Sequence, residues 1–203
     1  MDVKERLVSY MYFAEQNTTT RYQGSSAAWN CICRPGYYNG SHSTDCTPCP
    51  AGTYKESAGT GACTLCMAGY YNPTIAGDFS GSCLPCPFGS NSSAGSNSSD
   101  SCICVAGYGL DNYCVPCAPG KYSTSEDKYC INCTSNTYST AVGATASSTC
   151  IPCPDNSITL GAASNKGSDC RCKLGYSGLN GGICTICHPG TYSDTTGPDP
   201  CTR

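Results

Sequence analysis

The chain has 203 residues, of which 21 are Cys, 23 are Gly and 13 are Pro. This cysteine content is typical of a disulfide scaffold, and Leu, Ile, Val and Phe are too few to build the apolar core of an ordinary globular domain. A formal net charge of −3 and 15 Tyr argue against a disordered chain. They also exclude the basic surface that nucleic-acid binding requires.

Residues 1–30 differ from the rest because they contain no Cys and carry the apolar stretch L-V-S-Y-M-Y-F-A. This stretch is too short to span a membrane and lacks the uninterrupted apolar run of a secretion signal. We interpret 1–30 as the end of a preceding domain or a linker. Because the number of Cys is odd and the chain stops just short of another C-x-x-C, we expect a piece of a longer, secreted protein.

From residue 31 onward the cysteines come in close pairs. C-x-C pairs begin at Cys31, Cys102 and Cys170, and three C-x-x-C pairs lie between one C-x-C and the next. This order predicts a repeat of about 70 residues built from four small modules. The units are 31–101, 102–169 and a truncated third unit, 170–203.

Most modules have a Gly or Pro shortly after their first Cys, often followed by Tyr, as in Gly52 with Tyr54 and Gly120 with Tyr122. Gly permits a positive φ, Pro presets a turn, and Tyr offers a large surface that can cover a disulfide. Helical periodicity is absent after residue 30. We therefore predict a small disulfide-rich fold, a tandem array of short two-stranded β-ribbon and loop modules that forms an elongated rod.

Paired cysteines also suit two other chemistries. C-x-x-C brings two thiolates to one tetrahedral zinc ion, and a single C-x-x-C serves in redox catalysis. Zinc modules occur mostly in reducing compartments, whereas redox catalysis needs a βαβ setting, which no pair in this sequence has. We therefore expect no metal and no cofactor.

N-x-S/T sequons indicate the secretory pathway and place the protein outside the cell or at the cell surface. Asn39, Asn91 and Asn97 lie in Gly- and Ser-rich segments where an oligosaccharide could project, so we expect sugars there first. Asn17 and Asn132 also match the motif and rank behind these three, because cross-links beside Asn132 would hinder the transferase.

Catalytic residues are not evident. The two histidines, His42 and His188, have no nucleophile or carboxylate partner by sequence, so we interpret both as solvated loop residues. We predict that the chain is not an enzyme.

The repeated segments C-I-C-R-P-G-Y from Cys31, C-I-C-V-A-G-Y from Cys102 and C-R-C-K-L-G-Y from Cys170 permit a comparison with known families. Together with C-x-x-C-x-P-G-x-Y and C-x-x-C-P, they resemble the ephrin-receptor-like cysteine-rich repeat over residues 31–203. The resemblance implies an extracellular spacer or stalk, and it carries little information on function. The chain departs from the family by inserting a third C-x-x-C module into each unit.

C-x-C-x-x-G-Y also resembles the last loop of an epidermal-growth-factor-like module, in which the second Cys of C-x-C bonds to the next Cys along the chain. This resemblance implies a ladder that leaves Cys31 for a partner upstream. A competing scheme joins Cys31 to Cys46 and Cys33 to Cys49 and leaves Cys201 unpaired, and spacing alone does not decide between them. The ladder pairs are Cys33 with Cys46, Cys49 with Cys63, Cys66 with Cys83, Cys86 with Cys102, Cys104 with Cys114, Cys117 with Cys130, Cys133 with Cys150, Cys153 with Cys170, Cys172 with Cys184, and Cys187 with Cys201.

A repeat in which each module contacts mainly its neighbours behaves as a mechanical element. We expect a non-enzymatic structural glycoprotein of an extracellular filament, stalk, cell wall or flagellar hair, which self-associates and carries covalent glycans. We expect no nucleic-acid partner and no direct membrane insertion. The alternative is the stalk of a cell-surface receptor or adhesin whose binding domain lies outside this sequence.

Overall fold

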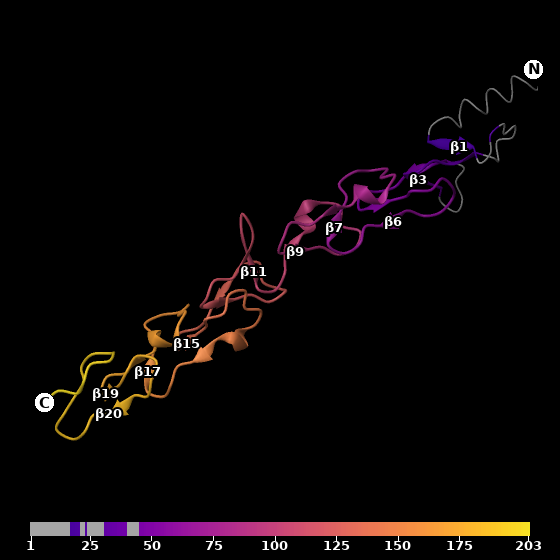
Figure 1. Cartoon of the computed structure of the whole chain (residues 1–203). Helices are drawn as coiled ribbons and strands as arrows, with labels where there is room; N and C mark the ends of the chain where they lie inside the picture. Colours follow the sequence, from indigo (N-terminus) through magenta and orange to yellow (C-terminus); the bar gives the residue numbers. More distant parts are fainter. Residues whose placement is uncertain (1–16, 21–22, 24–30, 40–44) are drawn as a thin grey trace, which may run out of the picture. The chain divides into compact units, whose positions relative to one another are not determined.

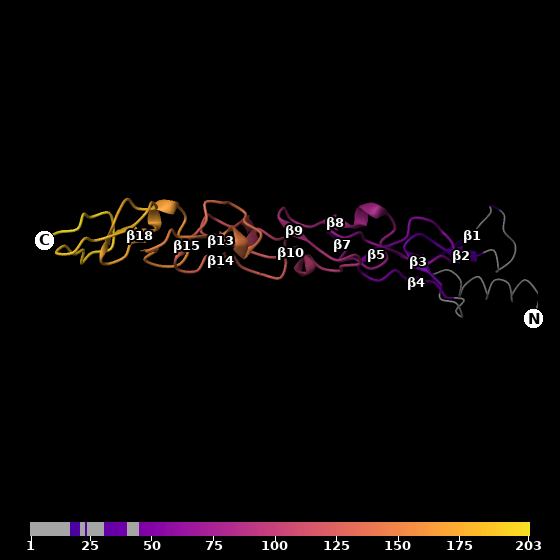
Figure 2. The same ribbon diagram turned by 90° about the horizontal axis from the view of Figure 1, so that it is seen from below.

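The computed structural model describes residues 17–20, 23, 31–39 and 45–203. His42 and most of residues 1–30 lie outside the described residues. The chain divides into two compact units, Met1–Ile103 and Cys104–Arg203. Within each unit, small two-stranded sheets follow one another in the order of the sequence (Figure 1 and Figure 2).

The first unit consists of short antiparallel pairs in which most strands have two residues, too few to be stable alone. Two 3₁₀ turns, η2 (Ser80–Ser82) and η3 (Ser99–Ser101), come directly before cysteines. The pairs are β1 (Thr18–Thr20) with β2 (Cys31–Cys33), β3 (Tyr37–Tyr38) with β4 (Thr47–Pro48), β5 (Thr53–Tyr54) with β6 (Thr64–Leu65), β7 (Tyr70–Tyr71) with β8 (Leu84–Pro85), and β9 (Ser90–Asn91) with β10 (Ile103–Cys104).

The second unit repeats this plan, and its 3₁₀ turns are η4 (Ser147–Thr149) and η5 (Gly167–Asp169). Its longest hairpin joins β11 (Tyr108–Asp111) to β12 (Tyr113–Pro116). The remaining pairs are β13 (Lys121–Tyr122) with β14 (Ile131–Asn132), β15 (Thr137–Tyr138) with β16 (Ile151–Pro152), β17 (Ser157–Ile158) with β18 (Arg171–Cys172), and β19 (Tyr176–Ser177) with β20 (Thr185–Ile186).

Each described module is closed by one disulfide, which joins its opening cysteine to its closing cysteine, and there are ten of these bonds. Their pairs are those of the ladder, from Cys33 with Cys46 to Cys187 with Cys201, and Cys31 is the one free cysteine among the described residues. Half-cystines make up most of the buried apolar side chains. The prediction of tandem disulfide-rich ribbon modules is confirmed.

Non-reducing digestion followed by mass spectrometry should recover the ladder in solution. The peptide that contains Cys33 is expected to be linked to the Cys46 peptide, because Cα atoms 5.4 Å apart allow an ordinary disulfide. A fragment that links Cys33 to Cys49 would instead support the interleaved scheme. Digestion after full reduction and alkylation serves as the control for peptide assignment.

Candidate functional site

Every module begins with the same tight turn. We call the third residue after the opening cysteine the turn residue. In all ten described modules the N–H of the following residue donates to the carbonyl three positions earlier, and the turn residue has a φ between 61° and 86°. This is the geometry of a type II turn, which requires Gly or Asn at that position. The turn residues are Gly36, Gly52, Gly69, Gly89, Gly107, Gly120, Asn136, Asn156, Gly175 and Gly190.

The turn is also where one module bonds to the next. We call the sixth residue after an opening cysteine the anchor residue. The backbone N–H of Gly52 donates to the carbonyl of the anchor residue Asn72 in the following module, over 2.8 Å. Gly120 makes the same 2.8 Å bond to the anchor residue Ser139. Because buried backbone groups need partners, the module that follows completes the turn of the module before it.

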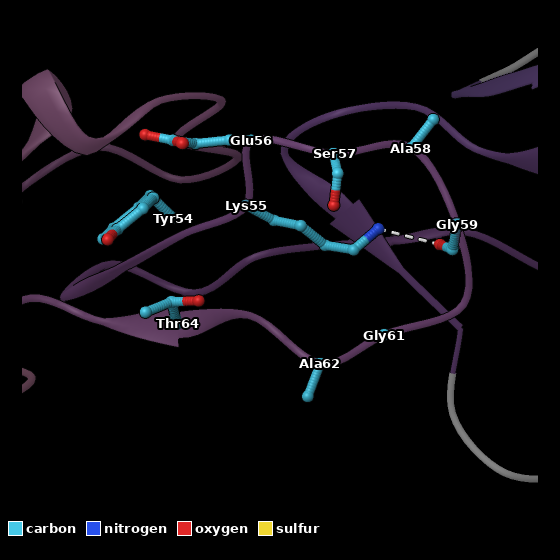
Figure 3. Close-up of a pocket in the computed structure, with 9 residues that line it drawn as sticks. All are labelled: Tyr54, Lys55, Glu56, Ser57, Ala58, Gly59, Gly61, Ala62 and Thr64. Carbon is cyan, nitrogen blue, oxygen red and sulfur yellow. Dashed lines mark hydrogen bonds between the residues drawn. The ribbon is translucent and has the colours of Figure 1, made fainter.

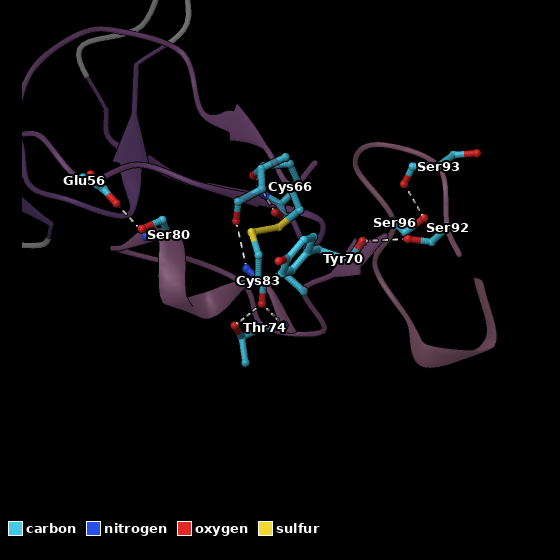
Figure 4. Close-up of a disulfide and its surroundings, with 12 residues drawn as sticks. Glu56, Cys66, Tyr70, Thr74, Ser80, Cys83, Ser92, Ser93 and Ser96 are labelled. Carbon is cyan, nitrogen blue, oxygen red and sulfur yellow. Dashed lines mark hydrogen bonds between the residues drawn. A yellow bond between two sulfur atoms is a disulfide. The ribbon is translucent and has the colours of Figure 1, made fainter. Parts of the chain in front are cut away.

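The anchor side chain returns a hydrogen bond to the preceding module. The Asn72 amide donates to the Thr53 carbonyl over 2.9 Å, and Asn72 is fully buried. The Ser92 hydroxyl donates to the Tyr70 carbonyl over 2.9 Å (Figure 4). Each junction of this kind is therefore fixed by bonds that run in both directions.

A second set of bonds holds the loop of a module against the opening cysteine of the module before it. The N–H of Ala76 donates to the Cys49 carbonyl, and the N–H of Gly143 donates to the Cys117 carbonyl, over 2.8 and 2.7 Å. The same bond recurs from Gly59, Gly95 and Ala163 to Cys33, Cys66 and Cys133. Ala76 lies in the left-handed region with a φ of 61°, a conformation that costs a non-Gly residue about 1–2 kcal/mol.

These loops also reach the module two positions earlier. A Cβ atom built on Gly52 would lie 2.1 Å from the Gly95 carbonyl oxygen, and one built on Gly120 would lie 2.3 Å from that of Ala163. A Cβ on Gly190 would meet nothing within 4 Å. A turn that such a loop covers therefore requires glycine for two reasons. Its φ is positive, and a neighbouring carbonyl oxygen occupies the place of a Cβ atom. Where the turn residue is Asn136, it is exposed, so a side chain fits.

Lys55 is the one anchor residue of the described modules that carries a charge. It is 5% exposed, and its Nζ donates to the Tyr37 carbonyl over 2.9 Å. It also donates to the Gly59 carbonyl over 2.8 Å (Figure 3). Burial lowers the pKa of this ammonium group, because a low-dielectric environment disfavours the charged form. The neighbouring carboxylate of Glu56 does not pair with it and instead accepts the N–H of Ser80 over 2.8 Å (Figure 4).

A small pocket of 290 Å³ lies beside Lys55 (Figure 3). It combines one ammonium group, one carboxylate and hydroxyl groups with the small residues of the loop. Its lining residues are Tyr54, Lys55, Glu56, Ser57, Ala58, Gly59, Gly61, Ala62 and Thr64.

The lowered pKa of Lys55 predicts a pH dependence of stability. Between the lowered pKa and the ordinary value of 10.5, the unfolded chain binds more protons than the folded one, so stability at this site rises with pH. A Lys55→Arg variant stays protonated and lacks this rise. The melting temperature of the native chain minus that of the variant is therefore expected to increase as pH approaches 10.5 from below. A difference that stays flat or falls would contradict the assignment.

Loss of a neutral anchor should loosen one junction. Ser123 is fully buried, and its hydroxyl donates to the Tyr108 carbonyl over 2.8 Å. Replacing it by alanine removes that bond inside the junction, which should cost about 1 kcal/mol. Ser125→Ala, two residues away at an exposed position, is the matched control and should change nothing. Amide hydrogen exchange of Gly107 and Ser123 would report the difference, and equal exchange in both variants would exclude an anchoring role.

The predicted sugar acceptors occupy different surroundings. Asn91 and Asn97 are exposed, whereas Asn39 is half-buried. Asn132 is exposed on β14, and the Asn17 side chain accepts a 2.7 Å bond from the Arg34 guanidinium. Asn91, Asn97 and Asn132 are therefore the three exposed members of the five.

The remaining sequence predictions concern histidine, metal binding and membrane insertion. His188 sits in an exposed turn, and its carbonyl accepts the N–H and the hydroxyl of Thr191. Among the described residues, no three His, Cys, Asp or Glu side chains lie together in a way that could hold a metal ion. Within the same residues, no helix has both the length and the apolar character that a membrane crossing requires.

The anchor residues are the feature that sequence analysis missed. Their residue types do not identify them, because a short polar residue in a cysteine-rich loop is ordinarily interpreted as solvent-exposed. Their constant distance from the opening cysteine could have identified them. Seven of the ten are buried, namely Lys55, Asn72, Ser92, Ser123, Ser139, Thr159 and Ser193. Asn39, Leu110 and Gly178 hold the same position and are not buried.

The repeated turn, anchor and disulfide define the chain as a tandem array of cysteine-rich repeat modules. Residues 36–78 and 120–170 match the family described as tyrosine-protein kinase ephrin type A/B receptor-like. Over these residues the chain is similar to the ephrin-receptor-like cysteine-rich repeat, and the resemblance that its motifs predict is confirmed there.

Two of the relatives are cysteine repeat proteins by name. Cysteine repeat modular protein B of Toxoplasma gondii is 34% identical over 187 residues, which cover 91% of this chain and 2% of that protein. Cysteine repeat modular protein A of the same organism is 28% identical, over 91% of this chain and 8% of its own length. The mouse sushi, von Willebrand factor type A, EGF and pentraxin domain-containing protein 1 is 36% identical over 39% of this chain and 2% of its own length.

The chain thus spans between 2% and 8% of the length of these relatives. Together with the disulfides, they indicate an extracellular repeat-rich protein. The names of the family and the relatives describe repeat or receptor-like modules.

Proposed function

We propose that this chain is a segment of a non-enzymatic structural glycoprotein at the cell surface or outside the cell, where it forms an elongated stalk or filament. The observation that carries the proposal is the repeated junction, in which turn and anchor bond a module to its neighbour at most of the described junctions. Repeats built on nearest-neighbour contacts extend along one direction. The names of the Toxoplasma relatives, cysteine repeat modular proteins, support a modular role.

Self-association of such segments is supported by large apolar side chains that are exposed, because the buried apolar side chains are mostly half-cystines. Met67 and Ile75 in the first unit are 71% and 66% exposed, and Val142 and Ile186 in the second are 66% and 68% exposed. Exposed apolar side chains are positions at which another protein surface can bind. We propose that copies of the array pack laterally through such positions, with sugars at Asn91, Asn97 and Asn39 on the remaining surface.

Analytical ultracentrifugation of the chain secreted from eukaryotic cells tests this function. We expect a high frictional ratio and oligomers that grow with concentration, with filaments visible by negative-stain electron microscopy. Enzymatic removal of N-linked sugars should convert the occupied Asn to Asp and identify the occupied sites by mass. A compact monomer would exclude the proposal.

The alternative is the stalk of a surface receptor or adhesin, which the receptor-like description of the family favours. A stalk of this kind holds a binding domain away from the membrane and does not need to self-associate. An elongated particle that stays monomeric at every concentration would therefore support the receptor stalk over the filament.

A further inference from the structure

The strand pair β1 and β2 has the geometry of a module, although no disulfide closes it. Asn17 has a φ of 74°, as a turn residue does, and it lies before β1. Its carbonyl accepts the N–H of Arg34 over 3.1 Å, as the carbonyl of the turn residue Asn156 accepts that of Lys173 over 2.9 Å. Arg34 and Lys173 each follow the second cysteine of a C-x-C pair.

The strand register repeats this correspondence. In β1 and β2, Thr18 faces Cys33, and in β17 and β18, Ser157 faces Cys172. The sequences agree as well, since N-T-T-T at residues 17–20 aligns with N-S-I-T at residues 156–159. Asn17 therefore occupies the place in its pair that Asn156 occupies in the module closed by Cys170.

The distance along the chain then identifies the position of a missing cysteine. Asn156 follows its opening cysteine, Cys153, by three residues, and Cys153 bonds to Cys170 at a separation of 17. Three residues before Asn17 stands Ala14, and Cys31 follows Ala14 at the same separation of 17. Cys31 is the free cysteine of the described chain.

We propose that β1 and β2, with Asn17 as turn residue and Cys31 as closing cysteine, belong to an eleventh module of the array, and that the sequence position of its opening cysteine, three residues before Asn17, carries Ala14. Cys31 is the closing cysteine of this module, and it is free because its partner position is an alanine. The repeat thus extends into the segment before the first C-x-C pair. The strands of this module pair as in the others, without the cross-link that the others have.

An Ala14→Cys variant tests the register. The native chain and the variant are refolded with oxidised glutathione, which accepts the two electrons of each new bond and is released as two reduced glutathiones. The native chain should show one thiol that reacts with iodoacetamide after unfolding. The variant should show none, and non-reducing digestion should link the peptide of position 14 to that of Cys31.

A Glu15→Cys variant is the matched control. The opening cysteine precedes the turn residue by three positions in every described module, and disulfide geometry tolerates little displacement, so this variant should keep two reactive thiols. The ten ladder bonds, mapped in the same digest, report that both variants fold. Two free thiols in Ala14→Cys, equal bonding in Glu15→Cys, or a rearranged ladder would each overturn the proposal.

Discussion

Reduction of the disulfides should unfold every described module. The fully buried side chains are mostly half-cystines such as Cys49, Cys66 and Cys117, together with small polar anchors. A loop of about 15 residues closed by a disulfide gains about 3 kcal/mol through restriction of the unfolded chain. Two-residue strands offer no comparable stabilisation, so no apolar core remains to hold the modules once the sulfur bridges are opened.

Hydrogen exchange measured by mass spectrometry after reduction and alkylation checks this result. Amides at the junctions, such as those of Asn72 and Ser139, are expected to lose their protection entirely. The control is the same chain treated with iodoacetamide alone, in which only a free thiol reacts and protection persists. Protected junction amides in a chain whose cysteines are all alkylated would refute the dependence on disulfides.

Substitution of a covered turn glycine should give the largest effect of a single side chain. In Gly120→Ala, the new Cβ meets the Ala163 carbonyl oxygen at 2.3 Å, and the turn has a φ of 83°. The left-handed conformation costs about 1–2 kcal/mol, and displacement of packed backbone adds about 1–3 kcal/mol. The N–H of Gly120 also donates to Ser139, so the junction with the next module should open at the same time.

Gly190→Ala separates the two costs. Gly190 has the same φ of 83°, but its Cβ would meet nothing within 4 Å, so only the conformational cost applies. Protection of the amides of Ser139 and Gly143 should fall strongly in Gly120→Ala, whereas Gly190→Ala should alter only its own module. Similar local losses in both variants would mean that the loop of Ala163 does not cover Gly120.

Turn chemistry explains why the modules were predictable while their junctions were not. The order of cysteine, turn residue and Tyr lies within about six residues, and local preferences of Gly and Asn act over that range. The junction bonds join residues about 20 apart, such as Gly52 and Asn72, and no local pattern reports them. The connectivity of the cysteines was open for the same reason, since two schemes satisfy one spacing.

Composition and spacing by themselves determined that this chain is a tandem series of cross-linked ribbon modules, because cysteine is the abundant side chain able to replace an apolar interior. Only the tertiary structure decided which serines, asparagines and lysine are buried as anchors and which glycines are covered. Those properties depend on the loop of one module coming to rest on the turns of the two before it. That placement results from backbone hydrogen bonds between modules, which any sequence with suitable turns can make.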